Sequence, residues 1–126
     1  MKKAIYVIED DPISQIMIKT LLNQAGVEGS IFENYQSALN KIREDKMINT
    51  LPLAIFSDFM LPDGDGLDFL NQLRQLIPSE KLPFYFITGV QKEMIEPFVE
   101  KHQYSAIISK PLHKDELNVI IASLTK

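Results

Sequence analysis

The chain has 126 residues, of which 45% are hydrophobic, 24% are charged, 5 are Gly and 7 are Pro. These values exclude a disordered or fibrous protein, and the length fits a single domain, 1–126, burying roughly two-thirds of the surface of the unfolded chain. The formal net charge is −4 and no clustered basic face is visible, so we expect no direct binding to nucleic acid.

Charge, cysteine content and apolar run lengths narrow the class of protein further. When the acidic residues Glu9, Asp10, Asp11 and Asp58 are set aside, 13 of the 17 acidic residues remain, which equals the 13 basic residues. The net negative charge of the chain therefore equals the charge of these four residues. The absence of Cys excludes disulfides and Cys-based metal sites. The apolar run before Glu9 is too short for a signal peptide, and no stretch approaches the length of a membrane span. We therefore expect a cytoplasmic protein.

Five apolar runs alternate with five helical patterns along the chain. The runs are continuous, which is typical of strands buried on both faces of a parallel sheet. They cover Ala4 to Ile8, Ser30 to Phe32, Leu53 to Phe56, Phe84 to Ile87 and Ala106 to Ile108, of which the second is the weakest. The helical patterns cover Pro12 to Ala25, Tyr35 to Lys46, Gly66 to Ile77, a segment within Gln91 to His102, and Lys114 to Leu124. Five such pairs predict an α/β fold with a doubly wound sheet and helices on both faces.

Polar side chains close four of the apolar runs. In a parallel α/β sheet the carboxyl ends of the strands share one edge, which is where these folds bind ligands. We therefore expect four groups to converge at that edge: Glu9-Asp10-Asp11, Ser57-Asp58, Thr88 and Lys110.

The first of these groups packs three carboxylates at the end of one strand. Acidic residues also favour the positive N-terminal end of a following helix, where Pro12 suits the first turn. Packed carboxylates repel one another at low dielectric, however, and a cation would neutralise them. Mg²⁺ takes oxygen ligands, commonly one or two carboxylates together with phosphate oxygens. The group therefore indicates a site for a hard cation and a phosphate.

Asp58 follows an apolar run and precedes a loop rich in turn residues. A carboxylate can attack a phosphoryl group and form an acyl phosphate. A simple turn role is the alternative, although Pro62 to Gly66 already supply turn chemistry. Two other uses of this loop fail on spacing. An EF-hand loop with Gly66 in its sixth position lacks its acidic first and twelfth ligands, and Phe69 replaces the third glycine of a dinucleotide fingerprint.

Thr88 and Lys110 supply donors that a phosphorylated carboxylate needs. A hydroxyl and an ammonium group placed in advance can bind the equatorial oxygens of a phosphoryl group. Each residue alone is ordinary, since lysines are mostly at the surface. Pro111 adds to the signal because it restricts the backbone conformation of Lys110.

Four motifs together carry a resemblance to a known family. They are Tyr6-Val7-Ile8-Glu9-Asp10-Asp11-Pro12, Ser57-Asp58 followed by Pro62 and Gly66, Ile87-Thr88-Gly89, and Lys110-Pro111. From end to end, the chain resembles the receiver domains of two-component response regulators, the CheY-like family. The resemblance implies a flavodoxin-like (βα)5 fold with a five-stranded parallel sheet. It also implies that a histidine kinase or histidine phosphotransfer protein transfers a phosphoryl group to Asp58.

The resemblance assigns a metal site as well. Glu9 and Asp10 would be the acidic pair, and the site for Mg²⁺, for which Mn²⁺ could substitute, would comprise Glu9, Asp10, Asp58 and the backbone carbonyl of Met60. The direct side-chain ligands would be Asp10 and Asp58. Asp11 would lie outside the direct ligands.

The resemblance further implies how the site would signal, and two departures affect that route. Thr88 would move toward the phosphoryl group and Lys110 would pair with it, which would change the surface formed by the last two helices and the last strand. Ile107 stands where the family often carries Tyr or Phe, so no aromatic ring can rotate inward there. Pro97 removes a hydrogen bond from the fourth helix, which predicts that this helix is short or displaced. A regular helix from Gln91 through Glu100 would contradict this prediction.

A third departure concerns the lifetime of the phosphorylated state. In receivers that hydrolyse quickly, the side chains two residues after the phosphorylated Asp and two after the Thr help to place the attacking water. Here these positions hold Met60 and Val90, which neither donate nor accept usefully. We therefore predict slow self-dephosphorylation, suited to a relay or to a sustained signal.

The first helix offers a candidate partner surface. Ile16 points away from its apolar face and Ile13 lies at the flank, so this pair could dock a helix beside the acidic site, although isolated surface isoleucines are also common. The face expected to pack on the sheet consists of Met17, Ile18, Leu21, Leu22 and Ala25.

These observations predict a signalling protein that catalyses its own phosphorylation and dephosphorylation, and not a conventional enzyme. An aspartate-nucleophile phosphatase would need a second carboxylate soon after its nucleophile, where Met60 stands. The alternative is a degenerate receiver that acts as a phosphorylation-independent binding module, against which the set Asp58, Thr88 and Lys110 argues. The expected partners are a sensor histidine kinase or phosphotransfer protein and an unidentified downstream protein, with no membrane.

Overall fold

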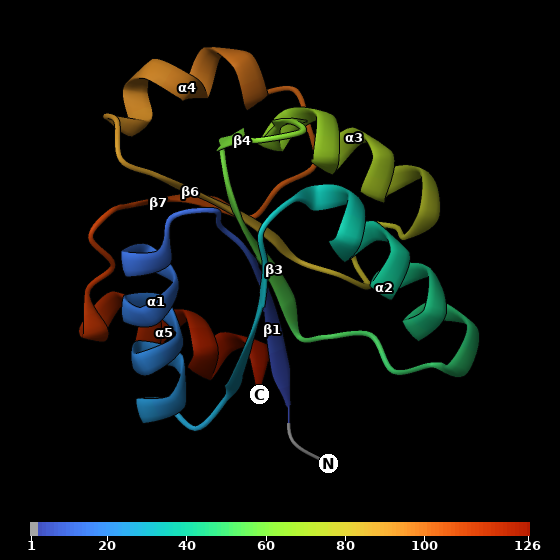
Figure 1. Ribbon diagram of the computed structural model, residues 1–126, viewed down its shortest axis with the longest axis horizontal. Coiled ribbons are helices and arrows are strands. Elements are labelled where there is room, and N and C mark those ends of the chain that lie inside the picture. The colour runs from blue at the N-terminus through green and yellow to red at the C-terminus, as the bar shows by residue number, and fades with distance from the viewer. Residues whose placement is uncertain (1–2) are drawn as a thin grey trace.

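The computed structural model describes residues 3–126, so the first two residues of the predicted domain, at the start considered for a signal peptide, lie outside it (Figure 1). Five parallel strands form one sheet in the order β2-β1-β3-β6-β7. They are β1 (Ala4–Ile8), β2 (Glu28–Phe32), β3 (Ala54–Asp58), β6 (Phe84–Thr88) and β7 (Ala106–Ser109). The five helices are α1 (Pro12–Gln24), α2 (Tyr35–Ile48), α3 (Gly66–Leu76), α4 (Lys92–Val99) and α5 (Lys114–Leu124).

Helices cover both faces of the sheet. Successive side chains of a strand point to opposite faces, so a strand of continuous apolar residues makes both faces apolar. In β1, Ile5 and Val7 pack in a core with α1 and α5, whereas Tyr6 and Ile8 pack with α2 and α3. Figure 1 shows α1 and α5 together on one side of the sheet, with α2 and α3 on the other. The predicted doubly wound parallel sheet is confirmed. Among residues 3–126, no helix combines the length and apolar character that a membrane span requires.

The first helix begins at Pro12 as predicted, and four of the five residues expected to pack on the sheet do so. Pro12 occupies the first helical position, and Gly26, just beyond the helix, has a φ of 85°. Ile18 and Leu22 are buried as predicted, and Ile13 and Ile16 are exposed at 70% and 67%. Met17, which was predicted to pack on the sheet, is 48% exposed. The buried stripe of α1 is therefore narrower than the hydrophobic pattern of the sequence.

The fourth helix is the shortest of the five, at eight residues, which agrees with the prediction from Pro97. Gln91 and Glu100 are its caps, so the helix stops one residue short, at each end, of the regular Gln91–Glu100 helix that would have contradicted the prediction. Pro97 lies inside it and has no N–H to donate. Ile95 and Val99 are the buried residues that hold this short helix to the fold.

A small hairpin between β3 and α3 was not predicted. Its strands are β4 (Met60–Leu61) and β5 (Gly64–Asp65), which pair antiparallel, Met60 with Asp65 and Leu61 with Gly64. Each strand has two residues, too few to produce a recognisable alternation in the sequence. The hairpin rises from the end of β3 and leads directly into α3 (Figure 1).

Candidate functional site

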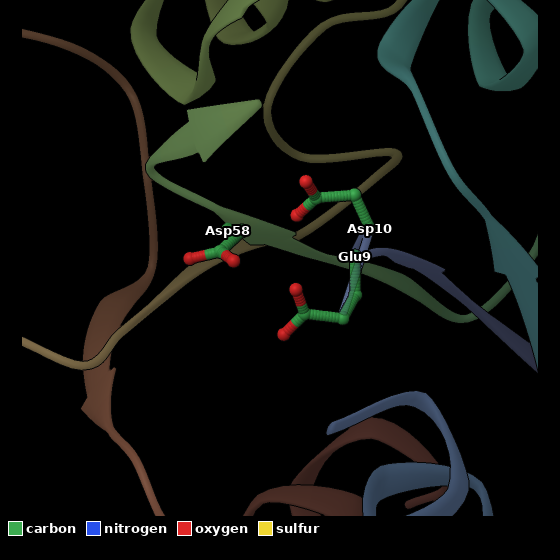
Figure 2. A group of neighbouring side chains, drawn as sticks. All are labelled: Glu9, Asp10 and Asp58. Atoms are coloured by element: carbon green, nitrogen blue, oxygen red, sulfur yellow. The ribbon is translucent and has the colours of Figure 1, made fainter. Parts of the chain in front are cut away.

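Three carboxylates meet at the carboxyl ends of two neighbouring strands. Ile8 at the end of β1 pairs with Ser57 in β3, which brings Glu9 and Asp10 beside Asp58. One oxygen of each carboxylate lies within 4.8 Å of the others (Figure 2). Glu9 is fully buried, Asp58 is half-buried and Asp10 is exposed. The topology therefore produces the acidic group that the sequence predicted.

Two contacts fix Glu9 at this edge. Its backbone N–H donates to the carbonyl of Phe32 in β2 at 2.9 Å, which extends the pairing of β1 with β2 by one residue. Its carbonyl accepts from Nε2 of Gln15, in the first turns of α1, at 2.7 Å. Gln15 was not predicted as part of the site, and no spacing in the sequence singles it out. These contacts leave the carboxylate of Glu9 directed toward the site.

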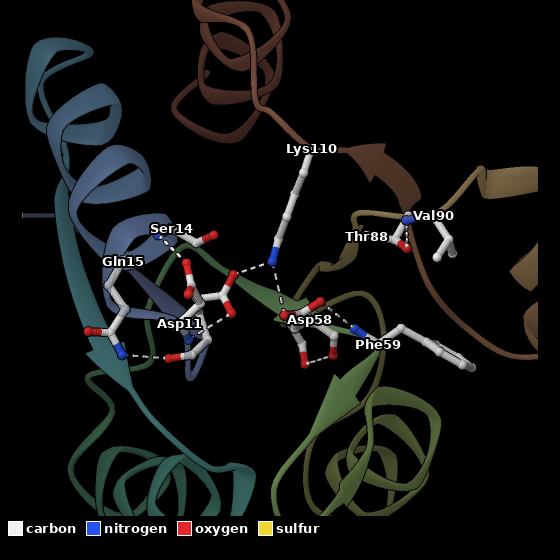
Figure 3. Close-up of polar contacts among 10 residues, drawn as sticks. Asp11, Ser14, Gln15, Asp58, Phe59, Thr88, Val90 and Lys110 are labelled. Carbon is white, nitrogen blue, oxygen red and sulfur yellow. Dashed lines mark hydrogen bonds and ion pairs between the residues drawn. The ribbon is translucent and has the colours of Figure 1, made fainter.

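Lys110 bridges two of the three carboxylates. Its Nζ donates to Oδ2 of Asp58 at 3.0 Å and also to the carboxylate of Glu9 (Figure 3). The Lys110 backbone N–H donates to the carbonyl of Thr88 at 2.7 Å, which places the lysine just beyond the end of β7. The Lys110–Pro111 peptide bond is cis, a detail that an X-Pro sequence alone does not determine. The ammonium group thus supplies a cation within the site itself.

Burial and charge set the protonation of the two central groups. Burial, together with the neighbouring carboxyl of Glu9, raises the pKa of Asp58 to about 6, and the lowering effect of Lys110 does not offset this. For Lys110, burial lowers the pKa, but the contacts with Glu9 and Asp58 outweigh it and the pKa is raised. Lys110 therefore keeps its charge. The pKa of Asp58 lies nearer to neutral pH than that of an ordinary aspartate.

The backbone around Asp58 is held as firmly as its side chain. Oδ1 of Asp58 accepts from the backbone N–H of Phe59 at 3.1 Å, and the hydroxyl of the buried Ser57 donates to the Asp58 carbonyl at 2.9 Å. Gly66, the first residue of α3, packs against that same carbonyl: a Cβ atom at this position would lie 2.7 Å from the oxygen. The sequence motif that places Gly eight residues after Asp58 thus has a steric cause.

Thr88 ends β6, the strand next to β3. Its side chain is buried, and Oγ1 accepts from the backbone N–H of Val90 at 3.1 Å. In Figure 3 Thr88 lies on the side of Asp58 away from Gln15, whereas the Lys110 side chain reaches down to Asp58 from the end of β7. The structure thus brings the predicted hydroxyl and ammonium groups to the edge where the carboxylates meet.

Asp11 caps a helix, and Met60 begins the hairpin that follows Asp58. Asp11 is the N-cap of α1, where its Oδ2 accepts from the backbone N–H of Ser14 at 2.8 Å, and this contact lowers the pKa of Asp11. Its own N–H donates to Oε2 of Glu9 at 3.2 Å. For Asp11 the helix-capping explanation therefore applies. Met60 begins β4, two residues after Asp58, and its side chain is 71% exposed.

The donor set at this edge suits a small hard cation. Glu9, Asp10 and Asp58 offer carboxylate oxygens only, and their spacing allows one ion to reach all three. Mg²⁺ prefers oxygen ligands and usually keeps some of its waters, which the exposure of Asp10 permits. The residues present therefore fit a magnesium ion.

The sequence is similar to those of known proteins over nearly the whole chain. A family model described as the response regulator receiver domain matches residues 5–122. Response regulator Rre1 of Synechocystis sp. is 34% identical over 82 residues, which cover 64% of this chain and 35% of that protein. The receiver protein CpdR of Brucella abortus is 24% identical over 117 residues, 93% of this chain and 91% of CpdR.

The fold has a close counterpart in a solved structure. It is the receiver domain of sensor histidine kinase PA1611 from Pseudomonas aeruginosa PAO1, solved with a magnesium ion coordinated in its active site cleft. The two chains superpose with a TM-score of 0.84 and 19% identity, each covered over 100% of its length. This likeness establishes the flavodoxin-like fold, and the family match confirms the resemblance noted in the sequence. The chain belongs to the response regulator receiver domain family.

Proposed function

We propose that this receiver domain accepts a phosphoryl group on Asp58 from a phosphohistidine of a sensor histidine kinase or a histidine phosphotransfer protein. The observation that carries the proposal is the position of Asp58. Its carboxylate lies beside those of Glu9 and Asp10 and accepts from the ammonium group of Lys110 at 3.0 Å. A carboxylate oxygen would form a bond to phosphorus as the bond from phosphorus to the imidazole nitrogen breaks, and the imidazole keeps that electron pair.

Each residue of the site has a role in this proposal. Glu9, Asp10, Asp58 and the backbone carbonyl of Met60 would hold Mg²⁺, or Mn²⁺ in its place. When bound, the ion would neutralise the charge on the carboxylates and on the phosphoryl oxygens. Lys110 and the hydroxyl of Thr88 would donate to the phosphoryl oxygens; the Thr88 proton is available for this because its oxygen accepts in the present contact with the Val90 N–H. Because the protein is itself the acceptor, it acts as a switch or relay component and not as a turnover enzyme.

The exposed face of α1 is the surface we propose for the phosphodonor. Ile13 and Ile16 are among its exposed apolar side chains. Beside them lies a groove of about 200 Å³ that reaches the site, since its lining consists of Ser14, Met17, Ile18, Leu21, Lys110, Pro111 and Leu112. An amphipathic helix placed there would bring its phosphohistidine toward Asp58.

Intact-mass analysis tests the proposed function directly. The protein is incubated with acetyl phosphate, with and without Mg²⁺, beside Asp58→Asn. We expect one added phosphoryl group that requires both Mg²⁺ and Asp58. If no adduct forms and no phosphate is released under any condition, the phosphoacceptor function is wrong.

A further inference from the structure

Two aspartates in the loop after Asp58 each bind the N-terminus of a different helix. Asp65 is the N-cap of α3, and its Oδ1 accepts from the backbone N–H of Asp68 at 2.8 Å. Asp63, at the turn of the β4–β5 hairpin, reaches the start of α2 instead. Its Oδ1 accepts from the N–H of Tyr35 at 3.2 Å, and its Oδ2 accepts from the N–H of Gln36 at 3.0 Å.

Asp63 supplies acceptors that α2 lacks. A helix leaves its first N–H groups without partners inside the helix, and a carboxylate is favoured there by the helix dipole. The N-cap of α2, Asn34, accepts only from the N–H of Ser37, at 2.9 Å. Asp63 binds the two N–H groups before it, those of Tyr35 and Gln36. The start of α2 is thus completed by a residue of the phosphoacceptor loop.

The side chain of Tyr35 strengthens this connection. Its ring stacks on Phe69 of α3 at a centroid distance of 5.6 Å, and its hydroxyl accepts from Nε2 of Gln72 at 3.2 Å. Gly64, with a φ of 143°, packs against the same ring, since a Cβ atom there would lie 3.0 Å from Tyr35 Cε2. The hairpin, the start of α2 and the face of α3 therefore form one packed unit.

The same unit is anchored to the phosphoacceptor. The N–H of Gly66 donates to the carbonyl of Phe59 at 2.6 Å, and Met60 pairs with Asp65, so the base of the hairpin is closed directly beside Asp58. Asp63 then holds the far end of the hairpin to α2. A shift of the Met60 backbone would therefore move the hairpin or break one of these contacts.

From these contacts we infer that Asp63 is a positioning residue of the site. By binding the Tyr35 and Gln36 N–H groups, it preorganises the loop that carries the Met60 carbonyl and couples occupation of the site to the N-terminus of α2. The inference rests on the proposed function. Because Asp63 ties the loop to these two amides, removing its carboxylate should weaken Mg²⁺ binding, and Mg²⁺ binding should change the protection of the same two amides.

Three variants test the inference through two readouts, Mg²⁺ affinity by titration and amide hydrogen exchange of Tyr35 and Gln36. Asp63→Ala removes both acceptors, Asp63→Asn keeps one acceptor oxygen, and Asn34→Ala is the matched control. Asn34→Ala weakens the same end of α2 without touching the hairpin. We expect Asp63→Ala to weaken Mg²⁺ binding about fivefold, in the lower range of site-to-site couplings, and Asp63→Asn to lie between it and the wild type. Asn34→Ala should bind Mg²⁺ like the wild type.

Amide exchange completes the test. In the wild type, Mg²⁺ should change the exchange of Tyr35 and Gln36, and in Asp63→Ala these amides should exchange rapidly with or without the ion. Equal Mg²⁺ affinity in all variants, or equal weakening by Asp63→Ala and Asn34→Ala, would overturn the inference. In that case labelling of Asp58 by acetyl phosphate would leave the proposed function standing. A wild-type protein with neither labelling nor Mg²⁺ binding would overturn both.

Discussion

Lys110 lies 3.0 Å from Oδ2 of Asp58 and binds the fully buried carboxylate of Glu9 as well. Without Lys110 the Glu9 carboxylate would be buried beside other carboxylates with no cation. Lys110→Met should therefore lower the free energy of unfolding by about 3 kcal/mol in the absence of Mg²⁺. Saturating Mg²⁺ should recover much of this loss relative to the wild type, because carboxylates that have lost the Lys110 charge should bind the cation more tightly. Urea denaturation with and without MgCl₂ measures both values, and an equal loss under both conditions would contradict the prediction.

The affinity for Mg²⁺ should depend on pH because of Asp58. Burial raises the pKa of this carboxyl to about 6 in the metal-free protein. Below that pH the group holds a proton, which must leave before the carboxylate can bind a cation. Lowering the pH from 7 to 5 should therefore weaken Mg²⁺ binding about tenfold, the change in the deprotonated fraction. Titrations across this range test it, and a flat profile would show that Asp58 is ionised throughout.

The phosphorylated state should be long-lived, and Met60 is one of the reasons. Its exposed side chain stands beside the site but offers no hydrogen bond to an attacking water. Met60→Gln should speed the decay of the phosphoryl group about tenfold, which corresponds to about 1.4 kcal/mol in the activation barrier. Met47→Gln, on an exposed Met of α2, is the control. Intact-mass measurements over time after removal of the donor provide the rates. Equal decay in all three proteins would exclude this role for Met60.

Docking of the phosphodonor on α1 can be tested with a matched pair of substitutions. Ile16 and Ile48 are exposed to nearly the same degree, 67% and 68%, but Ile48 ends α2 and Ile16 lies on α1. Ile16→Asp should slow transfer from a histidine phosphotransfer protein about tenfold or more, since a charge would be buried at the contact. Ile48→Asp should not, and transfer from acetyl phosphate should be normal in both variants. An unchanged protein-to-protein rate in Ile16→Asp would remove α1 as the docking surface.

Gly66 should not tolerate even the smallest side chain. A Cβ atom at this position would lie 2.7 Å from the Asp58 carbonyl oxygen, a backbone atom held by Ser57. Gly66→Ala should therefore lower the free energy of unfolding by about 2 kcal/mol. At Gly89 an added Cβ meets nothing within 4 Å, so Gly89→Ala is expected to be neutral or slightly stabilising. Chemical denaturation of both variants decides the matter, and equal stabilities would indicate that the loop relaxes freely.

The sheet and the convergence of the site could be predicted from the sequence because both follow from local patterns. Continuous apolar runs identified all five strands, and the ends of parallel strands share an edge whatever the loops do. Three of the predicted strands nevertheless ended too early, because each observed strand continues to a polar residue. Asp58, Thr88 and Ser109 belong to their strands, although apolar periodicity alone ends each strand before them.

Other features depend on contacts that no local pattern records. Asp63 looks like one turn residue among several, and its partners at the start of α2 lie nearly thirty residues earlier. Met17 belongs to the apolar stripe of α1 in sequence, yet α1 packs on the sheet through Ile18 and Leu22 and leaves Met17 48% exposed. The partners of Asp63 and the exposure of Met17 are therefore set by tertiary packing and not by the local sequence.

The hydrogen bond from the Lys110 backbone to the Thr88 carbonyl continues the ladder between β6 and β7 beyond Ser109. The backbone spacing of Thr88 and Lys110 is therefore set by sheet pairing, and of the segment that follows β6 the Val90 N–H contacts the Thr88 hydroxyl. The exposed positions of α4 beyond Val90 can therefore change in sequence while Thr88 and Lys110 keep their backbone spacing. Divergence among related chains should therefore be tolerated there more readily than at the strand ends.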